Sequence, residues 1–120
     1  MNKNYLVDRK KSIEFAFKGI SALVKSEPNA QIHLIASIFA ILSGLLLNIS
    51  NTEWCLIIFA IAFVWTVEAL NTTIEKIVDR LFPEFNEKAR YIKDVSAGAV
   101  LISSISALIT GIIIFVPKLF

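Results

Sequence analysis

The chain has very little cysteine, histidine and glycine, and these shortages exclude several classes of protein. Its 120 residues include 1 Cys, 1 His and 4 Gly. One cysteine cannot build an intrachain disulfide framework or a cysteine-rich metal site. The scattered glycines form neither a Walker loop nor a Rossmann phosphate loop. The lone histidine, His33, has no second histidine for a phosphohistidine mechanism, and we interpret it as a polar residue near a membrane surface.

Charge is also scarce, and the charge that exists is not arranged to bind nucleic acid. Charged residues make up 18% of the chain and the net charge is +2, whereas 56% of the residues are hydrophobic. A soluble domain is about 45–50% apolar and about 25% charged. The sequence has no basic face with interleaved aromatic residues, so we exclude DNA and RNA as partners. The excess of apolar residues predicts a membrane protein.

Three long apolar blocks predict an all-α membrane protein with three transmembrane helices. An apolar stretch of about 20 residues can cross the hydrocarbon core. We expect one membrane domain over residues 1–120, with membrane helices at 30–49, 54–80 and 95–116 and a polar loop at 80–94. The second helix reaches spanning length only if it tolerates an acid, Glu68.

The N-terminal segment predicts an amphipathic helix at 8–26 that lies on the membrane surface, because apolar and basic residues recur on different helix faces. No apolar segment of signal-peptide type precedes the first block, so we expect no cleaved leader. Lys and Arg gather before the first block and between the second and third. The positive-inside rule then predicts that the N-terminus lies in the cytoplasm and the C-terminus outside.

A stripe of polar residues follows one face of the second membrane helix. Glu68, Asn71, Glu75 and Asp79 are three or four residues apart, so they share about 80° of the helix surface. Glu68 lies about 21 Å along the helix from Trp54, inside the apolar layer, and the others continue toward the cytosol. An ionisable residue at membrane depth is costly and predicts function. A glutamate that only hydrogen-bonds a neighbouring helix would explain Glu68 but not its aligned companions.

Carboxylates at the cytoplasmic end of this stripe predict a magnesium site. Glu27, at the turn before the first span, is expected at the depth of Glu75. Mg²⁺ takes one or two protein carboxylates and completes its shell with water and phosphate oxygens. Glu27 is equally well explained as a helix N-cap before Pro28.

Three further charged residues have ordinary interpretations from spacing alone. Asp79 is expected to be solvated and paired with Arg80 or Lys76. Lys93 and Asp94 precede the third span and suit an interface anchor and an N-cap, although they could also bind phosphate and a polar group. Small residues at fourfold spacing in the first and third spans favour close helix packing. Three helices can hardly enclose a site alone, so we expect an oligomer.

Four motifs, in a fixed order, resemble the prokaryotic diacylglycerol kinase family, which includes undecaprenol kinases. The motifs are VEALNTTIEKIVDR at 67–80, FAFKGI at 15–20, SEPNAQIHL at 26–34 and KDVSAGAVL at 93–101. The resemblance covers nearly the whole chain. It implies a homotrimeric inner-membrane enzyme with sites between subunits, which moves the γ-phosphate of ATP to a lipid alcohol.

The resemblance also implies roles for individual residues. Glu68 matches the general base, and Glu27 and Glu75 match the ligands of the magnesium ion that holds ATP. Asp79 matches a supporting polar residue. The expected nucleotide-binding residues are Glu27, Asn71, Glu75, Asn86, Lys93 and Asp94. At Asn86 this chain departs from the histidine that many members carry.

The acceptor and two other functions stay open at this point. The EPNAQIHL stretch and the Glu53–Trp54 pair look closer to the undecaprenol kinases than to the enterobacterial diacylglycerol kinases, so we favour undecaprenol over diacylglycerol. A small proton-coupled multidrug transporter would also use an acid such as Glu68, but those proteins have four spans. A non-catalytic membrane assembly subunit would keep its function in Glu68→Gln and Glu75→Gln variants.

Overall fold

The computed structural model describes residues 3–120, which form four helices and no strand. The helices are α1 (Lys3–Ser26), α2 (Pro28–Leu47), α3 (Asn51–Leu81) and α4 (Glu87–Leu119). The last three are long and apolar enough to cross a membrane. The prediction of an all-α membrane protein with three spans and an N-terminal helix is therefore confirmed.

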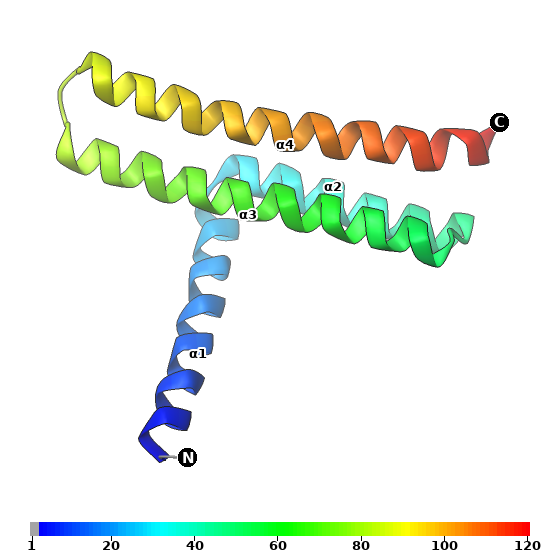
Figure 1. Cartoon of the computed structure of the whole chain (residues 1–120), viewed down its shortest axis with the longest axis horizontal. Helices are drawn as coiled ribbons and strands as arrows, with labels where there is room; N and C mark the ends of the chain where they lie inside the picture. The colour runs from blue at the N-terminus through cyan, green and yellow to red at the C-terminus, as the bar shows by residue number, and fades with distance from the viewer. Residues whose placement is uncertain (1–2) are drawn as a thin grey trace.

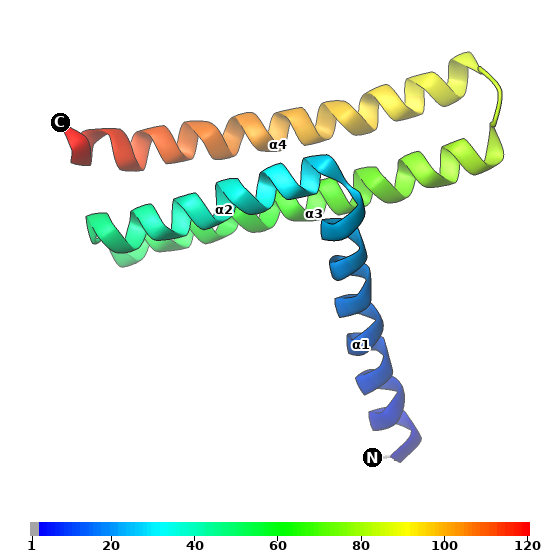
Figure 2. The ribbon, with the colours of Figure 1, turned by 180° about the vertical axis from the view of Figure 1, so that it is seen from behind.

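Helices α3 and α4 form a long antiparallel pair, and α2 lies against α3 over the half of the pair near the C-terminus (Figure 1). Helix α1 leaves this bundle crosswise, part-way along α3, as the view from behind also shows (Figure 2). If the bundle crosses the bilayer, α1 runs along its surface. None of the described residues of α1 is buried within the chain, which suits a helix in contact with a membrane or another copy.

The helix ends follow from local chemistry. Pro28 occupies the first turn of α2, where its missing N–H costs nothing. Asn48 ends α2 in the left-handed conformation (φ 52°), which asparagine tolerates well. Ser50 and Glu53 form a reciprocal capping box at the start of α3. Asn86 caps α4, its side-chain oxygen accepting the backbone N–H groups of Lys88 and Ala89 at 2.9 and 3.1 Å.

The loop between α3 and α4 is shorter than we expected. Only residues 82–86 lie outside the helices, whereas the sequence suggested a loop over 80–94. The Asn86 cap allows α4 to begin before the apolar block, so Lys93 and Asp94 lie on a helix. The expectation that Asp94 is an N-cap is wrong. At its other end α4 continues through Pro117.

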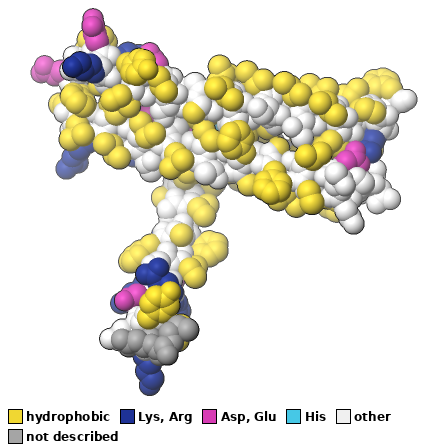
Figure 3. Space-filling view, in the orientation of Figure 1, with side chains coloured by type: hydrophobic (Ala, Val, Ile, Leu, Met, Phe, Trp, Pro, Cys, Tyr) yellow, Lys and Arg dark blue, Asp and Glu magenta, His cyan; other side chains and the backbone are white. Residues whose placement is uncertain are grey.

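The interior changes character along the bundle. Near the end of the bundle that holds the C-terminus, the core consists of Ile49, Ile57 and Ile114, with Trp54 and Phe115 packed against it. Further along α3, between the buried Val64 and Val78, three polar side chains are buried: Glu68, Asn71 and Thr72. The outer surface follows a different pattern, with charged side chains at the two ends of the bundle and apolar ones between them (Figure 3). The polar interior is where we look for a site.

Candidate active site

Glu68 is the centre of the polar interior. Glu68 is 1% exposed to solvent, and its Oε2 atom has no hydrogen-bond partner among residues 3–120. Nε2 of His33 on α2 faces this atom at 3.6 Å. A buried carboxylate without a hydrogen-bond donor is costly. The geometry therefore agrees with the functional interpretation of this residue.

Asn71 lies one turn further along α3 and is fixed by α4. Its Oδ1 atom accepts a hydrogen bond from the Ser96 hydroxyl at 2.8 Å, and both side chains are buried. This contact uses the carbonyl side of the amide, so the NH₂ group is the part that can donate to a ligand.

Two further carboxylates lie near Glu68. The charges of Glu75 and Glu27 both act on Glu68, so the turn between α1 and α2 faces this part of α3. Glu27 occupies the N-cap position of α2, but its side chain makes no cap hydrogen bond. It faces Nζ of Lys76 instead, at 3.5 Å. Glu27 is therefore the N-cap residue by position, as the simpler interpretation expects, but its side chain does not cap the helix.

These carboxylates suit a magnesium ion that arrives with a nucleotide. The described residues contain no group of three or more His, Cys, Asp or Glu side chains that could hold a metal alone. Mg²⁺ usually keeps several waters and binds one or two carboxylates together with substrate phosphates. Glu27 and Glu75 supply hard oxygen donors of that kind, so the donor set fits.

Lys93 brings positive charge to the end of the stripe next to the α3–α4 loop. Its Nζ atom lies 2.7 Å from Oδ1 of Asp79, joining α4 to α3. The expected partners of Asp79, Arg80 and Lys76, do not make this contact. With its side chain 30% exposed, Lys93 remains accessible to a phosphate group.

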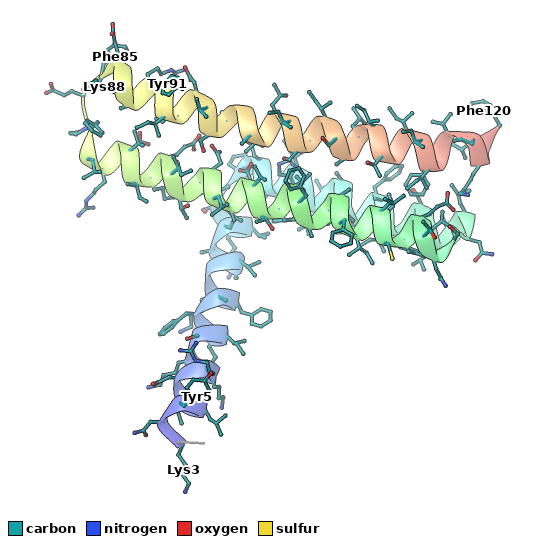
Figure 4. The ribbon with its side chains drawn as sticks, viewed as in Figure 1. Lys3, Tyr5, Phe85, Lys88, Tyr91 and Phe120 are labelled. Carbon is teal, nitrogen blue, oxygen red and sulfur yellow. The ribbon has the colours of Figure 1, made fainter. Side chains whose placement is uncertain are left out.

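The remaining predicted site residues point elsewhere in the single chain. Asp94 pairs with Arg90 on the same helix at 3.1 Å, and its side chain is 61% exposed. Because adjacent helical residues point about 100° apart, Asp94 and Lys93 face different sides of α4. Asn86 caps α4 beside the loop, at the end of the bundle where Figure 4 labels Phe85 and Lys88. One chain thus gathers only part of the predicted site.

Sequence reasoning missed two partners of the stripe, His33 and Ser96. His33 was interpreted as a polar residue near the membrane surface. It is, however, a polar residue inside an apolar block, and the same pattern predicted a functional role for Glu68. Ser96 gave no comparable signal, because serine is common in membrane helices that pack closely.

Comparison with known proteins now identifies the group to which the chain belongs. Residues 14–115 match the family described as prokaryotic diacylglycerol kinase. The undecaprenol kinase of Bacillus subtilis is 36% identical over 109 residues, which cover 91% of this chain and 89% of that protein. The diacylglycerol kinase of Escherichia coli K12 is 32% identical over 104 residues, covering 87% of this chain and 85% of that one.

The chain belongs to the prokaryotic diacylglycerol kinase family. It is therefore an ATP-dependent lipid kinase, and a multi-pass membrane protein. The resemblance found in the sequence is confirmed, and membership of a kinase family speaks against the transporter and the assembly subunit.

This member of the family has an apolar groove that leads to the polar interior. The groove encloses about 530 Å³ between α2, α3 and α4. Small residues on α2 and α4, among them Ala36, Ala40, Ala107 and Gly111, leave the space open. His33 lines it as well, and the same residue approaches Glu68. A hydrocarbon chain in this groove would bring its polar end close to the buried carboxylate.

Proposed function

We propose that this kinase transfers the γ-phosphate of MgATP to the hydroxyl group of undecaprenol, with Glu68 as the general base. The observation that carries the proposal is the burial of Glu68 beside an apolar groove. The 36% identity to an undecaprenol kinase favours this acceptor, and diacylglycerol is the second candidate.

The reaction needs a base at the depth of the lipid headgroup. Glu68 accepts the hydroxyl proton, and the oxygen forms a bond to the γ-phosphorus. The bond between that phosphorus and the β–γ bridging oxygen breaks, so ADP leaves and the lipid phosphate remains. A lipid hydroxyl cannot move far from the interface, so the buried position of Glu68 suits this role better than that of any exposed acid.

Charge neutralisation and positioning are the main demands of phosphoryl transfer. We assign Glu27 and Glu75 to a magnesium ion, which would neutralise charge on the ATP phosphates. Asn71 and Lys93 would then hold the nucleotide, and Asp79 would hold Lys93 through the 2.7 Å contact. Asp94 and Asn86 complete the proposed nucleotide site.

The groove supports a lipid acceptor with a long chain. Its lining on α4 runs from Ser104 to Val116, about 18 Å along the helix axis. A slot of this length holds part of one long isoprenoid or acyl chain, with the hydroxyl end toward Glu68 and the rest of the lipid outside.

We further propose a homotrimer with sites between subunits, with the N-terminus in the cytoplasm and the C-terminus outside. Asp94 supports the shared site, because within one chain it points away from the side of α4 that faces Asp79. The positive-inside distribution of Lys and Arg supports the orientation.

Transfer of label from γ-labelled ATP to undecaprenol and to diacylglycerol, presented separately in mixed micelles with magnesium, tests the function. Glu68→Gln should lower kcat by about 10²–10⁴-fold, which is the usual contribution of a general base. Glu84→Gln, in the exposed α3–α4 loop, is the matched control and should keep wild-type activity. No label in either lipid from folded wild-type protein would overturn the proposal, and label in diacylglycerol alone would overturn the choice of acceptor.

A further inference from the structure

His33 and Glu68 each carry a buried atom that no other group satisfies. These atoms, Nε2 of His33 and Oε2 of Glu68, are the buried side-chain nitrogen and oxygen atoms without a hydrogen-bond partner in residues 3–120. They face each other at 3.6 Å, slightly beyond hydrogen-bond distance. Catalytic hydrogen bonds are often long in a ligand-free enzyme and shorten when substrate binds. A small approach of these two atoms on substrate binding would therefore form one hydrogen bond and satisfy both of them.

Helix α3 packs against the imidazole ring and is linked to the backbone of α2 at His33. The Ser37 hydroxyl donates to the backbone carbonyl of His33 at 2.6 Å, and Nε1 of Trp65 donates to the same hydroxyl at 3.0 Å. The Trp65 ring meets the His33 ring edge-on, with centroids 6.5 Å apart and an interplanar angle of 67°. Trp65 lies one turn before Glu68, so the helix that carries the base also contacts the histidine ring.

We infer that His33 is a positioning residue for Glu68: its Nε2–H donates to Oε2 and leaves the other carboxylate oxygen to accept the proton of the lipid hydroxyl. This inference rests on the proposed function, in which Glu68 is the base. An ionised carboxylate only accepts hydrogen bonds, so the imidazole must present N–H rather than a lone pair at Nε2.

The other charged groups near Glu68 cannot take this role. The groups whose charges act on it besides His33 are Glu27 and Glu75, and both are carboxylates. Lys76 and Lys93 are engaged with Glu27 and Asp79. Without the His33 donor, no hydrogen bond to Oε2 fixes the orientation of the buried carboxylate. A displacement of about 1 Å at a reacting group can cost about 10²-fold in rate.

Methionine and glutamine form a matched pair for the test, because they have similar shapes and only glutamine donates a hydrogen bond. We expect His33→Met to lower kcat about 10- to 100-fold, with the KM for MgATP changed less than about twofold. His33→Gln, whose amide nitrogen reaches the position of Nε2, should restore most of the lost kcat. A merely structural histidine would not separate these variants, so equal kcat values for both would overturn the inference.

A second measurement does not depend on activity or on the folding of His33 variants. Because the chain has 1 His, labelling histidine with ¹⁵N gives signals from His33 alone. We expect wild-type protein in micelles to show the proton on Nε2, and Glu68→Leu to shift the Nε2 signal and alter the balance of tautomers. Identical spectra for the two proteins would overturn the inference.

The two experiments also separate the inference from the proposed function. If wild-type protein phosphorylates neither lipid but the ¹⁵N signal depends on Glu68, the pair exists and the function is wrong. If the wild type is active and the His33→Met variant equals it in kcat, the function stands and the positioning role is wrong.

Discussion

At the scale of single residues, the spacing of the stripe on α3 was enough to predict which side chains share a face. Glu68 and Asn71 are both buried on that face, and Glu75 acts on Glu68 through its charge. The partners from other helices could not be predicted in this way. Periodicity describes one helix, whereas the pairing of Asn71 with Ser96, or of Asp79 with Lys93, depends on how two helices are rotated against each other.

The contact between Lys93 and Asp79 leads to a prediction on nucleotide affinity. Lys93→Met should raise the KM for MgATP about 10- to 100-fold, because a hydrogen bond from a charged donor contributes about 1.5–3 kcal/mol. Asp79→Asn should have a smaller effect in the same direction, since it only releases Lys93. Steady-state kinetics with varied MgATP measure both.

Lys88→Met is the control for that experiment. Lys88 lies on the same helix and is exposed at the loop end, where Figure 4 labels it. If Lys88→Met and Lys93→Met change the KM equally, general positive charge rather than the Lys93 site attracts the nucleotide.

At the scale of helices, the sequence predicted the number and order of the elements but not all their ends. An apolar block in the sequence predicts the part of a helix that lies within the membrane. The residues at which the helix begins and ends are set by its capping residues. Asn86 starts α4 well before the apolar block, and only its side-chain hydrogen bonds reveal this. The crosswise direction of α1 agrees with the surface position that its amphipathic pattern predicted.

Helix packing at Gly44 leads to a stability prediction. A Cβ atom at this position would lie 2.7 Å from the Trp54 ring and 3.1 Å from Ile49. We therefore expect Gly44→Ala to lower the free energy of unfolding by about 1–3 kcal/mol, the usual cost of overpacking. Denaturant unfolding in micelles measures this change. Gly98→Ala is the control, since nothing lies within 4 Å of its added Cβ, and equal stability of both variants would contradict the packing argument.

The groove between α2 and α4 leads to a prediction on lipid affinity. Gly111 lines the groove and has nothing within 4 Å of a built Cβ, so a leucine side chain would extend into the open space. We expect Gly111→Leu to raise the KM for the lipid about tenfold, while the KM for MgATP stays constant. The leucine would displace methylene groups of the lipid from the groove, and each one costs about 1–3 kcal/mol of binding free energy.

Ser106→Leu is the matched control for the groove. Ser106 is exposed on α4, bonds the carbonyl of its own helix and does not line the groove. Kinetics with varied lipid at saturating MgATP compare the two variants. An unchanged lipid KM in Gly111→Leu would mean that the chain of the acceptor lies elsewhere.

At the scale of the whole molecule, the single chain leaves much of its surface without protein partners. In the most apolar part of α2 and of α4, only 11% of the residues are buried inside the chain, and the corresponding value for α3 is 28%. Lipid covers such surface well, but it cannot supply the charged groups that a nucleotide site needs. The outward-facing Asp94 is therefore the residue that best reports whether sites are shared between copies.

Mixed oligomers test this sharing. If Asp94 serves the site of a neighbouring subunit, Glu68→Gln and Asp94→Asn homotrimers are both impaired, but a mixture regains activity. In a closed ring each site joins one subunit to the next. When the two variants are mixed in equal amounts, about half of the sites have an intact Glu68. Independently, about half have an intact Asp94 from the neighbouring copy. About a quarter of the sites therefore have both residues and recover activity.

A mixture of Glu68→Gln with Glu75→Gln provides the control, because both residues lie on the same face of α3 in one chain and no pairing of subunits can rebuild that face. This mixture should stay inactive. Recovery in the Asp94 mixture but not in the Glu75 mixture requires a site that crosses the subunit boundary between α3 of one copy and α4 of the next. Failure of both mixtures to recover, with oligomers formed in each, would assign the complete site to a single chain.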